Sequence, residues 1–100
     1  MQKKLVHPVF FENSCGKERV IAEVQTMDQA FDAIREFLDE HEYKCYCTRF
    51  WLEETEYEDA PCVVLTFDVG SWSEFFHIYF DNMFQADQFR DSLSEEKKPF

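Results

Sequence analysis

The chain has 100 residues, which suffice for one domain and leave no room for a second. Apolar residues make up 45% of it and aromatic residues 18%, which excludes intrinsic disorder, while two Gly and three Pro exclude collagen-like and linker-like chains. With 21 Asp and Glu against 10 Lys and Arg, the formal net charge is −11, which argues against binding nucleic acid or an anionic membrane through a basic face.

The N-terminal part of the chain predicts a β-hairpin followed by a helix. Two strand-like runs, 9–11 and 19–24, flank the turn-forming segment 13–17. Thr26 and Gln29 then fit a capping box, in which the hydroxyl accepts a hydrogen bond from the amide three residues on. Apolar residues recur at steps of three and four after this cap: Met27, Ala30, Phe31, Ile34, Phe37 and Leu38. This spacing predicts an amphipathic helix that ends at about residue 41 or 42.

The rest of the chain predicts three strands and a second helix. The strands are expected over 43–53, 62–69 and 75–80, joined by an acidic loop over 54–61 and a turn over 70–73. Asn82 is placed to cap the second helix, with Gln85 three residues on. The inner side of this helix is predicted to carry Met83, Ala86, Phe89, Arg90 and Leu93. A polar tail follows from about residue 94.

These elements predict an α+β fold. Their order is β-β-α-β-β-β-α, and the short connections between the last three strands favour an antiparallel meander. Two helices that cover one face of such a sheet make a two-layer sandwich, formed by residues 1–100 as one domain. Phe31, Ile34, Phe37 and Leu38 are expected to pack beneath Leu65 and Phe67. The order of the strands in the sheet is left open.

The acidic residues gather in two places. In the first helix a stripe opposite the apolar face carries Asp28, Asp32, Glu36 and Asp39, followed by Glu40. In the predicted loop, Tyr57 stands among Glu53, Glu54, Glu56, Glu58 and Asp59. From residue 50 to residue 89 there is no Lys or Arg. These two groups are the candidate partner-binding residues.

Two interpretations of these acids remain open. Most charged runs are solvated surface. Alternatively, the carboxylates mimic nucleic-acid phosphates, because residues four apart on a helix are separated by about 6 Å along its axis, comparable with the phosphate spacing of one strand. The acids would then occupy a basic groove of a nucleic-acid-binding protein, and Tyr57 would anchor the interface.

The cysteines do not predict a metal site. Cys45 and Cys47 form a Cys-x-Cys pair, to which Cys62 could add a third thiol, but no Cys-x-x-Cys or Cys/His knuckle spacing is present. Without a signal peptide, reduced thiols are the better interpretation of all four cysteines, including Cys15.

Catalytic chemistry is not predicted either. Asp68, Ser71 or Ser73, and His77 could be drawn as a Ser/His/Asp arrangement, yet the Gly-x-Ser-x-Gly nucleophile elbow is missing. Two glycines cannot build a dinucleotide-binding or phosphate-binding loop. We therefore expect a protein without enzymatic activity, metal or cofactor.

Only the first few residues of the chain resemble a secretion signal. Lys3 and Lys4 precede apolar residues, but His7, Pro8 and Glu12 break the run before signal-peptide length. No run approaches the 18 or so apolar residues of a membrane span. The sequence therefore predicts a cytoplasmic protein.

Three segments carry a resemblance to a known group of proteins. They are Val-Ile-Ala-Glu-Val at 20–24 with Thr26, then Ala30, Ile34 and Phe37-Leu38, and then Asp-Val-Gly-Ser-Trp-Ser-Glu-Phe-Phe at 68–76. Over roughly residues 20–80 the chain resembles small uncharacterised proteins encoded by bacteriophages and prophages, with Asp-Val-Gly-Ser-x-x-Glu-Phe-Phe as the most distinctive stretch. The resemblance implies a viral accessory role and assigns no catalytic residue.

Together these features predict a phage-type accessory protein that binds and inhibits a host nucleic-acid-handling protein. Anti-CRISPR and anti-restriction proteins include such acidic nucleic-acid mimics. The comparison with them is an analogy between classes of protein and does not depend on a shared site. The expected partner is a basic host protein such as a nuclease, with no direct nucleic-acid or membrane contact. Two alternatives remain: a small protein-interaction or structural module of unknown partner, and a hydrolase or metal protein that uses Asp68, Ser71, Glu74, His77 or the cysteines.

Overall fold

A computed structural model describes residues 6–41, 49–69 and 74–93 and confirms the α+β fold. The elements follow the predicted order β-β-α-β-β-β-α. They are β1 (His7–Glu12), β2 (Glu18–Val24), α1 (Met27–Glu40), β3 (Arg49–Tyr57), β4 (Ala60–Asp68), β5 (Phe75–Phe80) and α2 (Met83–Asp91).

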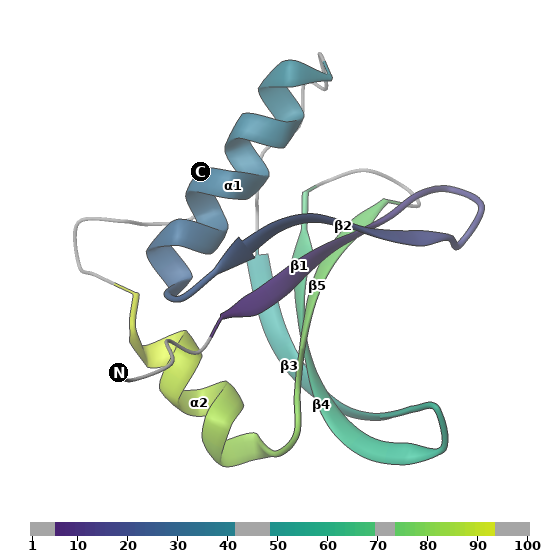
Figure 1. Cartoon of the computed structure of the whole chain (residues 1–100), viewed down its shortest axis with the longest axis vertical. Coiled ribbons are helices and arrows are strands. Elements are labelled where there is room, and N and C mark those ends of the chain that lie inside the picture. The colour runs from purple at the N-terminus through teal and green to yellow at the C-terminus, as the bar shows by residue number, and fades with distance from the viewer. Residues whose placement is uncertain (1–5, 42–48, 70–73, 94–100) are drawn as a thin grey trace.

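The five strands form one antiparallel sheet in the order β2-β1-β5-β4-β3. The last three strands make the predicted meander, and the N-terminal hairpin joins it through β1, which pairs with β5. In this pairing Phe10 lies opposite His77 and Phe11 lies opposite Phe76. The sheet is therefore completed by contacts between the two ends of the chain, with β5 at its centre (Figure 1).

Both helices pack on the same side of the sheet, which gives the predicted two layers (Figure 1). Phe31 is 2% exposed, and its ring meets the rings of Phe67 and Phe50 edge-on, at centroid distances of 5.5 and 5.6 Å. The helical residues Met27, Ala30, Phe31, Ile34, Phe37 and Leu38 all lie in one core with Val63, Leu65, Phe67 and Val69 of the sheet side. The predicted helix face and strand face are thus confirmed.

Side chains cap both helices where the sequence predicted. The Thr26 hydroxyl accepts a hydrogen bond from the Gln29 amide at 3.2 Å. The Gln29 side chain reaches back to the Gln25 amide at 2.7 Å, one residue earlier than in a standard capping box. Asn82 Oδ1 accepts from the Gln85 amide at 2.9 Å. The bonds to the Gln29 and Gln85 amides satisfy donors in the first turn of each helix, where no backbone acceptor is available.

The second helix is held at its C-terminal half. Ala86 and Phe89 are buried as predicted, and the His7 ring lies 5.0 Å from Phe80 and 5.1 Å from Phe89. Burial lowers the pKa of His7 below its ordinary value. The prediction that Met83 faces inward is wrong, because it is 37% exposed and lines an open depression beside the β3–β4 hairpin.

The predicted acidic loop over 54–61 is the second error, because most of it is strand. β3 continues to Tyr57, β4 begins at Ala60, and only Glu58 and Asp59 form the turn. Both turn residues have positive φ, 52° for Glu58 and 65° for Asp59. A two-residue hairpin of this twist requires such angles, and Asn-Gly is the pair that usually signals it. Because Glu58 and Asp59 adopt these angles without a glycine or asparagine, the sequence carries no hairpin signal at this turn.

Replacing Asp59 by glycine is expected to raise the free energy of unfolding by about 0.5–1 kcal/mol, because glycine adopts positive φ without the steric cost of a Cβ. Glu56→Gly, in the neighbouring strand, is the control and should lower it, because glycine weakens a strand interior. Urea denaturation measures both changes. A lower midpoint for Asp59→Gly would contradict the assigned turn.

Candidate functional site

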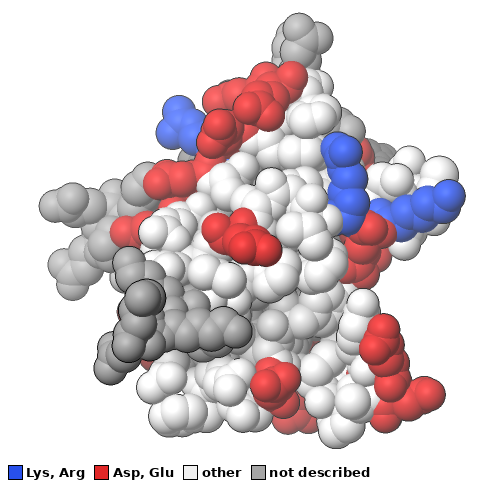
Figure 2. Space-filling view, viewed as in Figure 1, with Lys and Arg blue, Asp and Glu red and all other residues white. Residues whose placement is uncertain are grey.

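The acidic stripe of α1 is built as predicted. Asp32, Glu36, Asp39 and Glu40 are exposed and Asp28 is half-buried, on the side of the helix away from the core. Figure 2 shows red atoms along α1 with one blue side chain beside them. Arg35 is the one cation among the residues of this helix, so the stripe presents a nearly continuous negative surface to solvent.

The second acidic group forms an extended hairpin instead of a loop. Glu53, Glu54, Glu56, Glu58 and Asp59 are all exposed along β3 and the turn. Tyr57 is 49% exposed, and its ring lies 5.2 Å from the ring of Tyr79 on β5. The β3–β4 hairpin therefore curves toward β5, and the Tyr57 ring packs against the ring of Tyr79.

The two acidic groups do not form one site. In Figure 1, α1 rises to one end of the molecule, whereas the β3–β4 turn lies at the other end. In Figure 2, viewed from the same side, red atoms lie at the top and at the lower right of the molecule, and other acidic side chains lie between them. The candidate partner-binding residues thus belong to two surfaces, which one compact ligand would not touch together.

A third surface, which the sequence analysis did not identify, is the face of the sheet that points away from the helices. We call it the outer sheet face and define it by Phe10, Glu12, Trp51, Glu53, Thr66, Asp68, Phe75, His77 and Tyr79. The strand pairing sets Phe10 beside His77, His77 beside Thr66 and Thr66 beside Trp51, in one row across four strands. Thr66 is 5% exposed, whereas the rings around it are half-buried.

Tyr79 holds the centre of the outer sheet face. Its ring lies 5.5 Å from Phe10, 5.2 Å from Tyr57 and 6.2 Å from His77. Its hydroxyl donates to the carboxylate of Glu18, at 2.8 and 3.0 Å from the two oxygens. Burial raises the pKa of this hydroxyl, and the hydrogen bond to Glu18 raises it further. Tyr79 therefore stays a neutral donor and ties both hairpins to β5.

Of the Ser/His/Asp arrangement drawn from the sequence, the structure describes Asp68 and His77, which bind different partners. Asp68 pairs with Arg49, whose Nε lies 2.9 Å from Oδ2. His77 instead faces Thr66, at 3.1 Å from Nδ1, and Glu12, at 3.7 Å from Nε2. Ser71, Ser73 and Gly70 lie outside the described residues. Thr66, which is 5% exposed, thus links β4 to β5 through the His77 ring.

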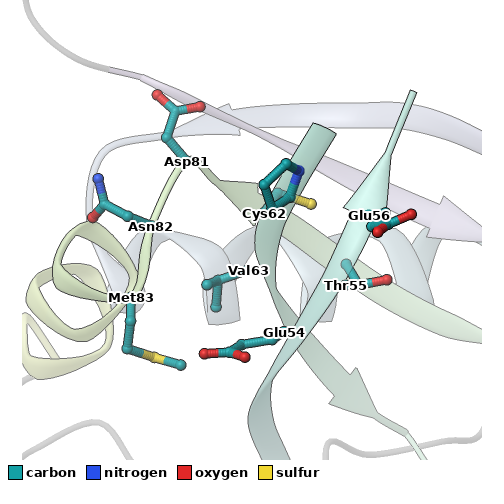
Figure 3. A pocket seen from close by; sticks show the side chains of 9 residues that line it. Glu54, Thr55, Glu56, Cys62, Val63, Asp81, Asn82 and Met83 are labelled. Atoms are coloured by element: carbon teal, nitrogen blue, oxygen red, sulfur yellow. The ribbon is translucent and has the colours of Figure 1, made fainter. Parts of the chain in front are cut away.

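An open depression of about 530 Å³ separates the β3–β4 hairpin from the start of α2. Figure 3 shows the Glu54 side chain reaching from β3 toward Met83, while Glu56 points the other way. Cys62, Val63 and Asp81 also line the depression. Because the carboxylates diverge, they do not converge on a common ion or reacting atom.

Within 6–41, 49–69 and 74–93, no three side chains of His, Cys, Asp or Glu stand close enough together to hold a metal ion. Cys15 and Cys62 are free thiols, and the Cys45/Cys47 pair falls outside these segments. Neither described helix combines the length and apolar character that crossing a bilayer requires.

Comparison with known proteins returns no match among family models, curated proteins or solved structures.

Part of the outer sheet face could have been predicted from the alternation of residues along β5. Phe75, His77 and Tyr79 alternate along β5, so their rings must share one face. Period alone does not reveal which strands lie beside β5. The pairing with β1 adds Phe10 and Glu12, which lie more than sixty residues earlier in the chain.

Proposed function

We propose that this protein binds a basic, nucleic-acid-handling protein and occupies the site that this partner uses for nucleic acid. The observation that carries the proposal is the exposed acidic stripe of α1, together with the absence of Lys and Arg from residue 50 to residue 89. A surface so strongly negative attracts a positive one over long distances and raises the association rate.

The spacing of the stripe supports mimicry of phosphates. Asp28, Asp32 and Glu36 follow one another at four-residue steps, so their positions are about 6 Å apart along the helix axis. Asp39 extends the stripe by one more turn. A rigid helix holds these carboxylates in a row without the entropy cost that a flexible acidic tail would incur on binding.

The proposal includes the biological setting. We infer a phage-type accessory protein without enzymatic activity that acts in the cytoplasm of a host cell as an inhibitor of anti-CRISPR or anti-restriction type. The motif at 68–76 supports the phage setting through its resemblance to phage and prophage proteins. The class analogy with acidic inhibitors of host nucleases supports the mode of action.

Competition is the test of this proposal. Proteins captured from host lysate at low salt are purified, and their affinity for DNA or RNA is measured with increasing amounts of this protein. We expect the apparent dissociation constant for the nucleic acid to rise in proportion to the added protein, and the complex to dissociate as salt increases. A partner that binds the protein and its nucleic acid at the same time would contradict mimicry. Salt-insensitive capture of a partner without a basic surface would support the interaction-module alternative instead.

A further inference from the structure

We propose that the outer sheet face binds the arginine side chains of an extended, arginine-rich segment of a basic protein. This inference deepens the proposed function, because it rests on a basic partner and names a surface and a side-chain chemistry for it. Its basis is the juxtaposition of half-buried rings and carboxylates on a sheet face opposite the two helices.

The rings form a continuous row along β5 that extends to β1. Phe75 and His77 lie with centroids 6.3 Å apart and nearly parallel, His77 and Tyr79 lie 6.2 Å apart, and Tyr79 meets Phe10 at 5.5 Å. All four side chains are half-buried, so part of each ring reaches solvent. Such flat aromatic surfaces are the preferred place for guanidinium groups to stack.

Carboxylates stand beside these rings. Glu53 accepts a hydrogen bond from the Trp51 indole at 2.8 Å, Glu18 accepts from Tyr79, and Glu12 faces His77. Among the described residues, neither Glu18 nor Glu53 forms an ion pair with Lys or Arg. Figure 2 shows an indentation at the right of the molecule, between the β1–β2 and β3–β4 hairpins. Red atoms lie on both sides of it, and blue side chains lie next to the red atoms on its upper side.

The face already holds one guanidinium, which belongs to the chain itself. Arg49 Cζ lies 5.0 Å from the centre of the Trp51 ring, and its Nε donates to Asp68 at 2.9 Å. A ring on one strand and a carboxylate on the next strand thus bind this group from two sides. The same combination recurs at Phe75 and Glu12, which lie opposite each other on β5 and β1.

Charge selects the occupant. A nucleic acid could stack its bases on such a face, but Glu12, Glu18 and Glu53 would repel its phosphates. A second copy of this chain would bring another formal charge of −11 against the first. An arginine-rich segment matches both the rings and the carboxylates of the face, because a guanidinium group stacks on aromatic rings and also binds carboxylates.

The test compares two synthetic ten-residue peptides in which serine alternates with arginine or with lysine, so that their charges are equal. Trp51 is the reporter, in a Trp72→Phe background that leaves it as the one tryptophan. We expect the arginine peptide to bind at least about five-fold more tightly than the lysine peptide and to change Trp51 emission, because lysine stacks poorly on rings. Equal affinities, or binding without a change in Trp51 emission, would overturn the inference.

Matched variants localise the effect. Phe75→Leu and Glu53→Gln, on the face, should each lower the arginine preference. Phe84→Leu and Asp91→Asn should leave it unchanged, because both residues are exposed on α2, outside the candidate partner-binding residues. Circular dichroism confirms that each variant is folded, and Glu53→Gln provides the answer if Phe75→Leu unfolds. An arginine preference that is unchanged in a folded face variant would overturn the inference.

The two proposals can fail independently. If the face variants bind a captured partner as the wild type does, this inference fails while the proposed function stands. If the peptides behave as expected but no captured partner competes with nucleic acid, the proposed function fails alone.

Discussion

Replacing Phe31 by alanine is expected to lower the free energy of unfolding by about 3–5 kcal/mol, which is a large part of the stability of a domain this size. Phe31 lies at the contact between the two layers, where its ring meets Phe50 and Phe67. The substitution removes buried apolar area and leaves a cavity that the rings of two different strands cannot close without moving the sheet.

Phe84→Ala is the matched control for this substitution, because it removes the same atoms from a side chain that is 70% exposed. Its effect should be well under 1 kcal/mol apart from the small change in helix propensity. Chemical denaturation monitored by circular dichroism gives both values. If Phe31→Ala unfolds at the wild-type midpoint, then α1 does not pack on the sheet through this residue.

The second prediction concerns α1 as a binding surface. Replacing Glu36 and Asp39 together by lysine should weaken binding to a basic partner about ten- to thirty-fold at low salt, since two attractive contacts become repulsive and each exposed pair contributes about 0.2–1 kcal/mol. Most of the loss should appear in the association rate. The difference from wild type should shrink at high salt, because screening shortens the range of these charges.

The fold should survive this double substitution. Both residues are exposed in the C-terminal half of α1, which has no basic residue in its last turn, so lysine there interacts favourably with the helix dipole. Glu54→Lys/Glu56→Lys makes the same change in charge on the β3–β4 hairpin and serves as the control. Equal losses in the two variants would mean that net charge, and not the α1 stripe, attracts the partner.

The helices and most of the sheet-forming segments could be predicted from local sequence. Thr26, the apolar spacing of α1 and the alternation of Val63, Leu65 and Phe67 each specify one element and the face that it buries. Capping bonds and hydrophobic period depend on residues within a few positions of each other, so they are present in the sequence as patterns. The β3–β4 turn was missed because Glu58 and Asp59 adopt positive φ without the glycine or asparagine that signals it.

Parts of the candidate surfaces could also be predicted from local sequence. The sequence by itself determined the acidic stripe of α1, because helical period alone sets those carboxylates opposite the apolar residues. It also placed Phe75, His77 and Tyr79 on one side of a strand. Neither result depends on which element lies next to which.

Only the tertiary structure decided which residues share the outer sheet face and which acids stand apart. Pairing of β1 with β5 brings Glu12 and Phe10 to His77, and the curl of the β3–β4 hairpin brings Tyr57 to Tyr79. The same topology sends the α1 acids and the hairpin acids to opposite ends of the molecule (Figure 1). These arrangements depend on contacts between distant parts of the chain, whose formation is governed by burial of the common core and by loop closure, and no local pattern encodes them.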